Sequence, residues 1–193
     1  MNKLLNPIEF YNDRKLLIAN LIIFVIGTAL AVIMQAWFSS AIQLLFKSKI
    51  SIYETTLENI ISISLLTCVF FISGKIINRK TRLIDCLNLS LYTRIPFYII
   101  SLLNLTGSLS RNMPIELEDG SIKIPSSSAL NSTDYIISFI TSCLNIVVII
   151  FLTIVIYRSF KTLSNAKKTS DYIIFVVLFL LTTILSPSII NLI

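Results

Sequence analysis

Long apolar stretches alternate with short polar ones along most of the chain, and this pattern predicts helices that cross a membrane. Such a helix needs about 20 mainly apolar residues to span a hydrocarbon core about 30 Å thick. The stretches lie at about 16–38, 57–77, 86–106, 135–157 and 172–193. The first belongs to a charge-free run from Leu16 to Phe46, so we expect its helix to continue past Trp37 into the interface.

Positive charges are unevenly divided between the connecting segments on the two sides of the predicted membrane. If the N-terminus is cytoplasmic, the cytoplasmic segments carry 11 Lys and Arg, the opposite segments carry 4, and Arg94 lies within a span. Cytoplasmic loops of membrane proteins carry an excess of Lys and Arg. We therefore predict an all-α polytopic membrane protein, a single five-span helical bundle over residues 1–193 with a cytoplasmic N-terminus and an external C-terminus.

Composition agrees with this architecture and excludes several classes of function. Hydrophobic residues make up 55% of the 193 residues and charged residues 13%, against about 25% charged residues in an average soluble domain. The net charge of +6 then reports orientation in the bilayer, so we expect lipid as a partner and no nucleic acid. The chain has no histidine, and its three cysteines show no CxxC spacing, so we predict no metal site and no cofactor.

The sequence contains no pattern that is typical of an enzyme. The GxSxG, P-loop, HExxH and GxGxxG motifs are missing, and we expect no Asp, Glu or His deep within a span. Proton relays and hydrolytic sites inside a membrane need titratable groups at depth. We therefore expect neither an enzyme nor an ion-coupled transporter.

A polar segment in the predicted external loop 107–134 indicates a β-hairpin. Residues 115–124 alternate apolar and polar positions about Asp119-Gly120, a pair that favours a two-residue turn. This turn would place Glu116 opposite Lys123. One face would carry Ile115, Leu117, Ile122 and Ile124. An isolated hairpin is marginally stable, so this face is a lid on the helix ends, a surface for a partner or part of a mobile loop.

Arg94 is the one charged residue expected deep inside a span, and it lies two residues before Pro96. A charge at the centre of a membrane helix costs about 2.5–3.5 kcal/mol on insertion scales. Pro96 leaves the Tyr92 carbonyl without its usual donor, so Arg94 can bond this carbonyl or polar groups of other spans, such as Asn145 and Gln35. Two interpretations stay open: a snorkelling anchor in a kinked helix, or a contact for an anion, a headgroup or a partner inside the bundle.

Two basic clusters lie in the predicted cytoplasmic connections. They comprise Lys75, Arg79, Lys80 and Arg82 between the second and third spans, and Arg158, Lys161, Lys167 and Lys168 between the fourth and fifth. Each Lys or Arg near an anionic membrane surface contributes about 1 kcal/mol to its attraction. The clusters therefore either bind anionic headgroups or serve as topology determinants alone.

Three segments resemble the Yip family of Ypt/Rab-interacting membrane proteins, in particular its short prokaryotic members. They are NPIEFY before the first span, KIINRKTRLIDCLNLSLYTRIPFYI leading into the third, and YRSFKTLSNAKKTSDY between the last two. The resemblance implies a five-span bundle with a cytoplasmic N-terminus. Eukaryotic members act in vesicle traffic and engage prenylated small GTPases. This chain departs from them in having no long N-terminal domain and in having the external hairpin, and for prokaryotic members the resemblance implies no activity.

These observations together favour a non-enzymatic integral membrane protein of a prokaryotic inner membrane. We expect it to organise lipid or membrane protein partners, among them further copies of itself, through its helix faces and basic loops. The alternative is a permease component for a small molecule or a lipid, with Arg94 lining an internal path.

Overall fold

The computed structural model describes residues 2–47, 50–105, 107–111, 115–116, 122–123 and 132–190. In this part of the chain, five helical segments are long and apolar enough to cross a membrane. They are α3 (Asp13–Ile33), α4 (Ile52–Ile77), the combined segment Leu83–Asn104, α8 (Ser132–Ser164) and α9 (Thr169–Ile190). The prediction of a mainly helical chain with five potential membrane spans is thereby confirmed.

The outer surfaces of these helices are apolar, as expected for contact with lipid. Val25 and Ile33 on α3, Phe139 on α8 and Ile184 on α9 are all exposed. A helix that is hydrophobic all round is stable either in the core of a large protein or in a membrane. Because these side chains face outward, the bundle is suited to a multi-pass membrane protein.

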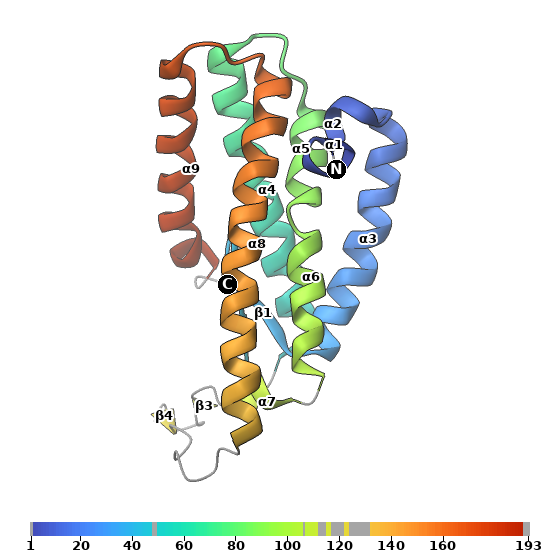
Figure 1. Cartoon of the computed structure of the whole chain (residues 1–193), viewed down its shortest axis with the longest axis vertical. Coiled ribbons are helices and arrows are strands. Elements are labelled where there is room, and N and C mark those ends of the chain that lie inside the picture. Colours follow the sequence, from blue (N-terminus) through green and yellow to red (C-terminus); the bar gives the residue numbers. More distant parts are fainter. Residues whose placement is uncertain are drawn as a thin grey trace.

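The two ends of the bundle hold different parts of the chain. The short helices α1 (Asn2–Leu5) and α2 (Pro7–Phe10) lie at the same end as the α8–α9 connection and the connection from α4 to α5 (Leu83–Tyr92) (Figure 1). The opposite end holds α7 (Ser108–Arg111) and the small strands β3 (Ile115–Glu116) and β4 (Ile122–Lys123) (Figure 1). We call these the N-terminal end and the β3–β4 end.

The helix boundaries differ from the predicted spans, most of all in the first. Helix α3 ends at Ile33 instead of continuing to residue 38 and beyond. Helix α4 begins at Ile52, before the predicted 57, because Ser51 caps it by accepting a hydrogen bond from the Tyr53 amide. Helix α8 continues through Ser164, past the predicted 157.

A second hairpin, which the sequence pattern did not predict, follows α3. Strands β1 (Ala36–Ser40) and β2 (Gln43–Phe46) pair antiparallel, and Gln35 turns the chain with φ of 54°. Strand β1 runs inside the bundle against α3, α4 and α9 (Figure 1). The expectation that a helix continues past Trp37 is wrong, because the chain turns back into the bundle at Gln35.

The third span is the most buried of the five and is broken in the middle. Helix α5 (Leu83–Tyr92) is followed by α6 (Ile95–Ser101) and the 3₁₀ turn η1 (Leu102–Asn104). The ring of Tyr98 on α6 lies directly against Gly27 of α3, where a Cβ atom would overlap it. Gly27 and Ala31 are both buried, so the small residues of α3 permit a close approach to α6.

The hairpin predicted in the external loop is present in a different register. Strands β3 (Ile115–Glu116) and β4 (Ile122–Lys123) pair Ile115 with Lys123 and Glu116 with Ile122. The predicted Glu116–Lys123 pair is therefore wrong, because the strands do not have the register that a two-residue turn at Asp119-Gly120 imposes. The other positions of the predicted hairpin, Leu117, Asp119, Gly120 and Ile124, lie outside the described residues.

Candidate functional site

The break in the third span occurs at Thr93 and Arg94. The Arg94 amide bonds to the Leu91 carbonyl at 3.1 Å, in a 3₁₀-type contact, and the Arg94 carbonyl accepts from the Phe97 and Tyr98 amides. Pro96 stands in the first turn of α6, where its missing N–H does not interrupt a ladder of hydrogen bonds. The third span is thus interrupted next to Pro96, where a kink was expected, and Arg94 sits at the junction of the two halves.

The guanidinium of Arg94 is enclosed by protein. The residue is 0% exposed, and its Cζ lies 5.2 Å from the ring centroid of Phe38 and 6.0 Å from that of Phe97. Phe97 belongs to α6, whereas Phe38 comes from β1. A side chain that is packed inside the bundle does not extend along the lipid surface, so this conformation is not that of a snorkelling anchor.

Within the described residues, none of the three guanidinium nitrogens of Arg94 has a hydrogen-bond partner. Asn145, a predicted partner, donates to the Thr141 carbonyl of its own helix at 3.1 Å. Gln35, the other predicted partner, forms the base of the hairpin, where its carbonyl accepts from the Lys47 amide. Burying an ion costs several kcal/mol, whereas a cation–π contact returns about 0.5–2 kcal/mol, so the two rings do not compensate fully.

A small polar cluster lies one helical turn from Arg94. The Asn59 side-chain amide donates to the Tyr98 hydroxyl and to Thr28 Oγ1, both at 2.8 Å. The Tyr98 ring also meets the Phe38 ring edge-on, at 5.9 Å between centroids. The cluster joins α3, α4 and α6, and it holds the Tyr98 ring against Phe38, one of the two rings that border Arg94.

A carboxylate is buried beside the β1–β2 hairpin, near the start of α4. Glu58 on α4 is 9% exposed and accepts a hydrogen bond of 2.6 Å from the indole N–H of Trp37. Its second oxygen, Oε2, has no partner in the described chain. The sequence analysis placed Glu58 at the edge of a span, but α4 begins six residues earlier, at Ile52.

At the N-terminal end, a cavity of about 740 Å³ lies between α2 and the last turns of α8. Its lining includes three of the predicted headgroup-binding cations, Arg158, Lys161 and Lys167, together with Glu9 and Asn6. The Asn6 amide donates to Glu9 at 2.6 Å and to Thr162 of α8 at 2.8 Å, so it joins the two elements. Asn6 is 7% exposed, and its Oδ1 has no partner among the described residues.

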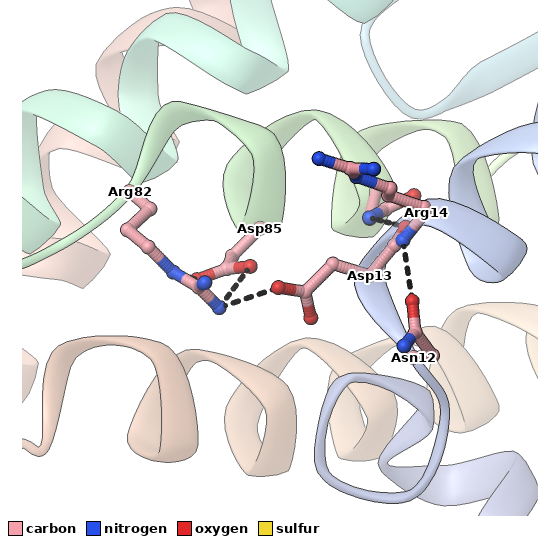
Figure 2. Close-up of polar contacts among 6 residues, drawn as sticks. Asn12, Asp13, Arg14, Arg82 and Asp85 are labelled. Atoms are coloured by element: carbon pink, nitrogen blue, oxygen red, sulfur yellow. Dashed lines mark hydrogen bonds and ion pairs between the residues drawn. The ribbon is translucent and has the colours of Figure 1, made fainter.

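The remaining predicted cations do not form one site. Arg82 bridges α5 to the start of α3, with Asp13 at 2.8 Å and Asp85 at 2.9 Å (Figure 2). The hydrogen bond to Asp85 raises the pKa of the Arg82 guanidinium, so Arg82 stays charged and links the starts of α3 and α5. Lys75 donates to the Arg79 carbonyl at 2.7 Å. Arg79, Lys80 and Lys168 belong to the same end of the bundle but do not line the cavity.

Two further cavities are apolar. One, of about 300 Å³, lies between α8 and α9 and is lined by Tyr157, Tyr172 and the hairpin residue Ile42. The other, of about 160 Å³, lies between α6 and α8 beside Pro96. Arg94 lines neither of them, so Pro96 and Arg94 do not share a cavity.

Sequence reasoning singled out Arg94 but missed the residues around it. Phe38 comes from the unpredicted hairpin, and Asn59, which bonds to Tyr98, comes from α4. Asn6 begins the segment NPIEFY, but the sequence does not indicate its contact with α8. The polar residues Gln35, Ser39 and Ser40, inside a run too long for one span, are the signal that could have indicated the hairpin.

Comparisons with protein-family models, with curated proteins and with solved structures returned no match. They therefore neither support nor contradict the resemblance to the Yip family, and the function is argued from the geometry of the chain alone.

Proposed function

We propose that the protein is a non-enzymatic, multi-pass membrane protein that binds anionic lipid headgroups in the cavity between α2 and α8, and so organises lipid and partners around the bundle. The observation that carries this proposal is the clustering of Arg158, Lys161 and Lys167 around a cavity of about 740 Å³. The positive-inside rule, applied to the connections at the N-terminal end, favours a position of this cavity at the cytoplasmic surface. The inner leaflet supplies anionic lipids there.

The cavity offers both kinds of group that a lipid headgroup requires. The three cations pair with phosphate oxygens, and Arg158 is able to do so with two parallel hydrogen bonds. The carboxylate of Glu9 lines the cavity and is an acceptor that suits the hydroxyl or ammonium groups of a headgroup. Phosphatidylglycerol has both a phosphate and hydroxyl donors, so it matches this lining better than phosphatidylcholine, which has no such donor.

The position of the cavity also favours a lipid over a soluble anion. Arg158 and Lys161 stand in the last turns of α8, where a helix attracts cations and ends at the membrane surface. The exposed ring of Phe10 lines the cavity, and the exposed Tyr11 follows it in the chain. Tyrosine rings lie preferentially at the level of the headgroups, which supports a position of the cavity at that depth.

The test is the binding of short-chain phosphatidylglycerol and phosphatidylcholine to the purified protein in a neutral detergent, measured by calorimetry. The pair Lys161→Gln and Lys167→Gln should weaken phosphatidylglycerol binding by about 30-fold, since two cations contribute about 2 kcal/mol. The pair Arg79→Gln and Lys80→Gln is the control, because it removes the same charge from the same end without touching the cavity. Equal losses in both pairs would mean diffuse attraction and would contradict a site.

The alternative of a permease component has one observation in its favour, the unpartnered guanidinium of Arg94. Arg94 lines none of the three cavities named above, so this alternative ranks second. Uptake of a solute by vesicles that contain the protein, lost in Arg94→Gln but not in the cavity variants, would reverse this order.

A further inference from the structure

The interior of the bundle contains a charged residue, Arg94, that has no role in the proposed headgroup cavity. The guanidinium of Arg94 has five N–H donors, and no described residue accepts from any of its three nitrogens. The side chain is fully buried between Phe38 and Phe97. Native proteins satisfy nearly all buried polar groups, so an enclosed guanidinium with free donors calls for an acceptor that the chain itself does not supply.

One side of this enclosure is formed by an element that differs from the helices around it. Phe38 belongs to the β1–β2 hairpin, and an isolated two-stranded hairpin is marginally stable. Its base is a non-glycine residue in the left-handed region, Gln35, with φ of 54°. At its tip, the Ala41 amide donates to Ser186 Oγ of α9 at 3.0 Å.

The hairpin also has room beside it. Ile42, next to Ala41 at the tip, lines the apolar cavity of about 300 Å³ between α8 and α9. Of the two rings beside the guanidinium, Phe38 is the one that no helix carries, so a movement of the hairpin would separate Phe38 from Arg94 without breaking a helix. Such a movement requires the buried contacts of β1 with α3, α4 and α9 to open locally.

We propose that Arg94 is an oxyanion-binding residue inside the bundle, and that the β1–β2 hairpin is the cover that admits the ligand. The ligand is a small planar oxyanion such as a carboxylate, because the fork of a guanidinium matches two coplanar oxygens with parallel hydrogen bonds. The site is distinct from the headgroup cavity at the N-terminal end, which is lined by other residues. Either site can exist without the other.

The first test uses the fluorescence of Trp37, the single tryptophan of the chain, which precedes Phe38 in β1. The purified full-length protein is titrated with sodium formate, and with sodium chloride at the same ionic strength. Formate should give a saturable change that chloride does not give. Arg94→Gln should abolish the change and Arg94→Lys should weaken binding at least tenfold, because lysine keeps the charge but lacks the fork. The exposed Arg14→Gln control should match the parent protein.

An Arg94→Gln protein that responds to formate like the parent would overturn the proposal, as would an equal response to chloride. Circular dichroism and elution volume establish that each variant is folded. If Arg94→Gln does not fold, Arg94→Lys alone decides: unchanged formate affinity in that variant counts against the site.

The second test locks the hairpin and does not depend on the folding of an Arg94 variant. Ala41→Cys and Ser186→Cys are introduced together, since the Ala41 amide and Ser186 Oγ are in contact, after Cys68, Cys86 and Cys143 are replaced by serine. In the oxidised protein the formate response should be lost, and reduction should restore it. An oxidised protein that still binds formate with the affinity of the reduced one would overturn the role of the hairpin as a cover.

Discussion

The close contact between Gly27 and Tyr98 makes Gly27→Ala an informative substitution. An added Cβ atom would lie 2.6 Å from Cε2 of Tyr98, with two further ring atoms closer still, so the ring has to move. Tyr98 is not free to do so, because its hydroxyl bonds to Asn59 and its ring packs edge-on against Phe38. The substitution therefore separates α3 from α6 or disrupts the cluster around Arg94.

The expected cost follows from these contacts. Overpacking a filled core costs about 1–3 kcal/mol, and a lost interhelical hydrogen bond in a membrane protein adds about 0.6 kcal/mol or somewhat more. The sum is about 2–4 kcal/mol, which corresponds to a melting temperature lower by about 4–16 °C for a chain of this size.

The assay is the reaction of a fluorogenic maleimide with Cys86 during heating. Cys86 is buried, whereas Cys68 and Cys143 are exposed and are first replaced by serine. Ala29→Val, at an exposed position of the same helix, is the control and should melt with the parent protein. In Tyr98→Leu, where the ring is absent, Gly27→Ala should cost much less than in the parent. A Gly27→Ala protein that melts within 1 °C of the parent would refute the packing of α3 against α6.

Two more substitutions test contacts elsewhere in the bundle, and the same melting assay checks both. Trp37→Phe removes the hydrogen-bond donor to the buried carboxylate of Glu58, so it should lower the free energy of unfolding by about 1–3 kcal/mol. An unchanged melting temperature would mean that this hydrogen bond does not hold the hairpin in place. Arg82→Gln breaks the contacts with Asp13 and Asp85, but the Arg82 side chain is 60% exposed, so the cost should stay below about 1 kcal/mol and shrink in high salt. A large, salt-independent loss would contradict this surface assignment.

The spans were the most predictable part of the fold, because they depend on a property of whole segments. A helix in lipid needs a long apolar stretch with its backbone bonded internally, and hydropathy reports this directly. The broken third span was also predictable, since Pro96 cannot continue a regular helix. Its bounds, 83–104, lie close to the expected 86–106.

The hairpin of residues 36–46 was not predictable in the same way. Its residues continue a charge-free run, and an average over a window does not separate buried strands from a helix. Its position depends on contacts with α4 and α9, which are distant in sequence. The register predicted for β3 and β4 was also wrong, because an Asp-Gly pair is compatible with more than one loop length.

In the candidate sites, too, the charged residues could be predicted from the sequence, whereas their contacts in the fold could not. Arg94 was singled out because a charge inside an apolar span is costly, but its enclosure by Phe38 requires the hairpin. The cations of α8 were singled out by their clustering, while the buried Asn6 that joins them to α2 comes from the other end of the chain. The sequence therefore singled out individual charged residues, but it did not indicate which residues they contact in the fold.

The orientation of the bundle tests the account most directly, because the headgroup binding proposed for the cavity between α2 and α8 requires that this cavity lie at the cytoplasmic surface. The measurement uses single cysteines at Ser170, near the start of α9, and at Tyr53, near the start of α4, which lie at opposite ends of the bundle. A membrane-impermeant maleimide added to intact cells should label Tyr53→Cys and leave Ser170→Cys unlabelled until the cells are opened. Labelling of Ser170→Cys in intact cells, with Tyr53→Cys protected, would place the basic cavity outside and contradict the account.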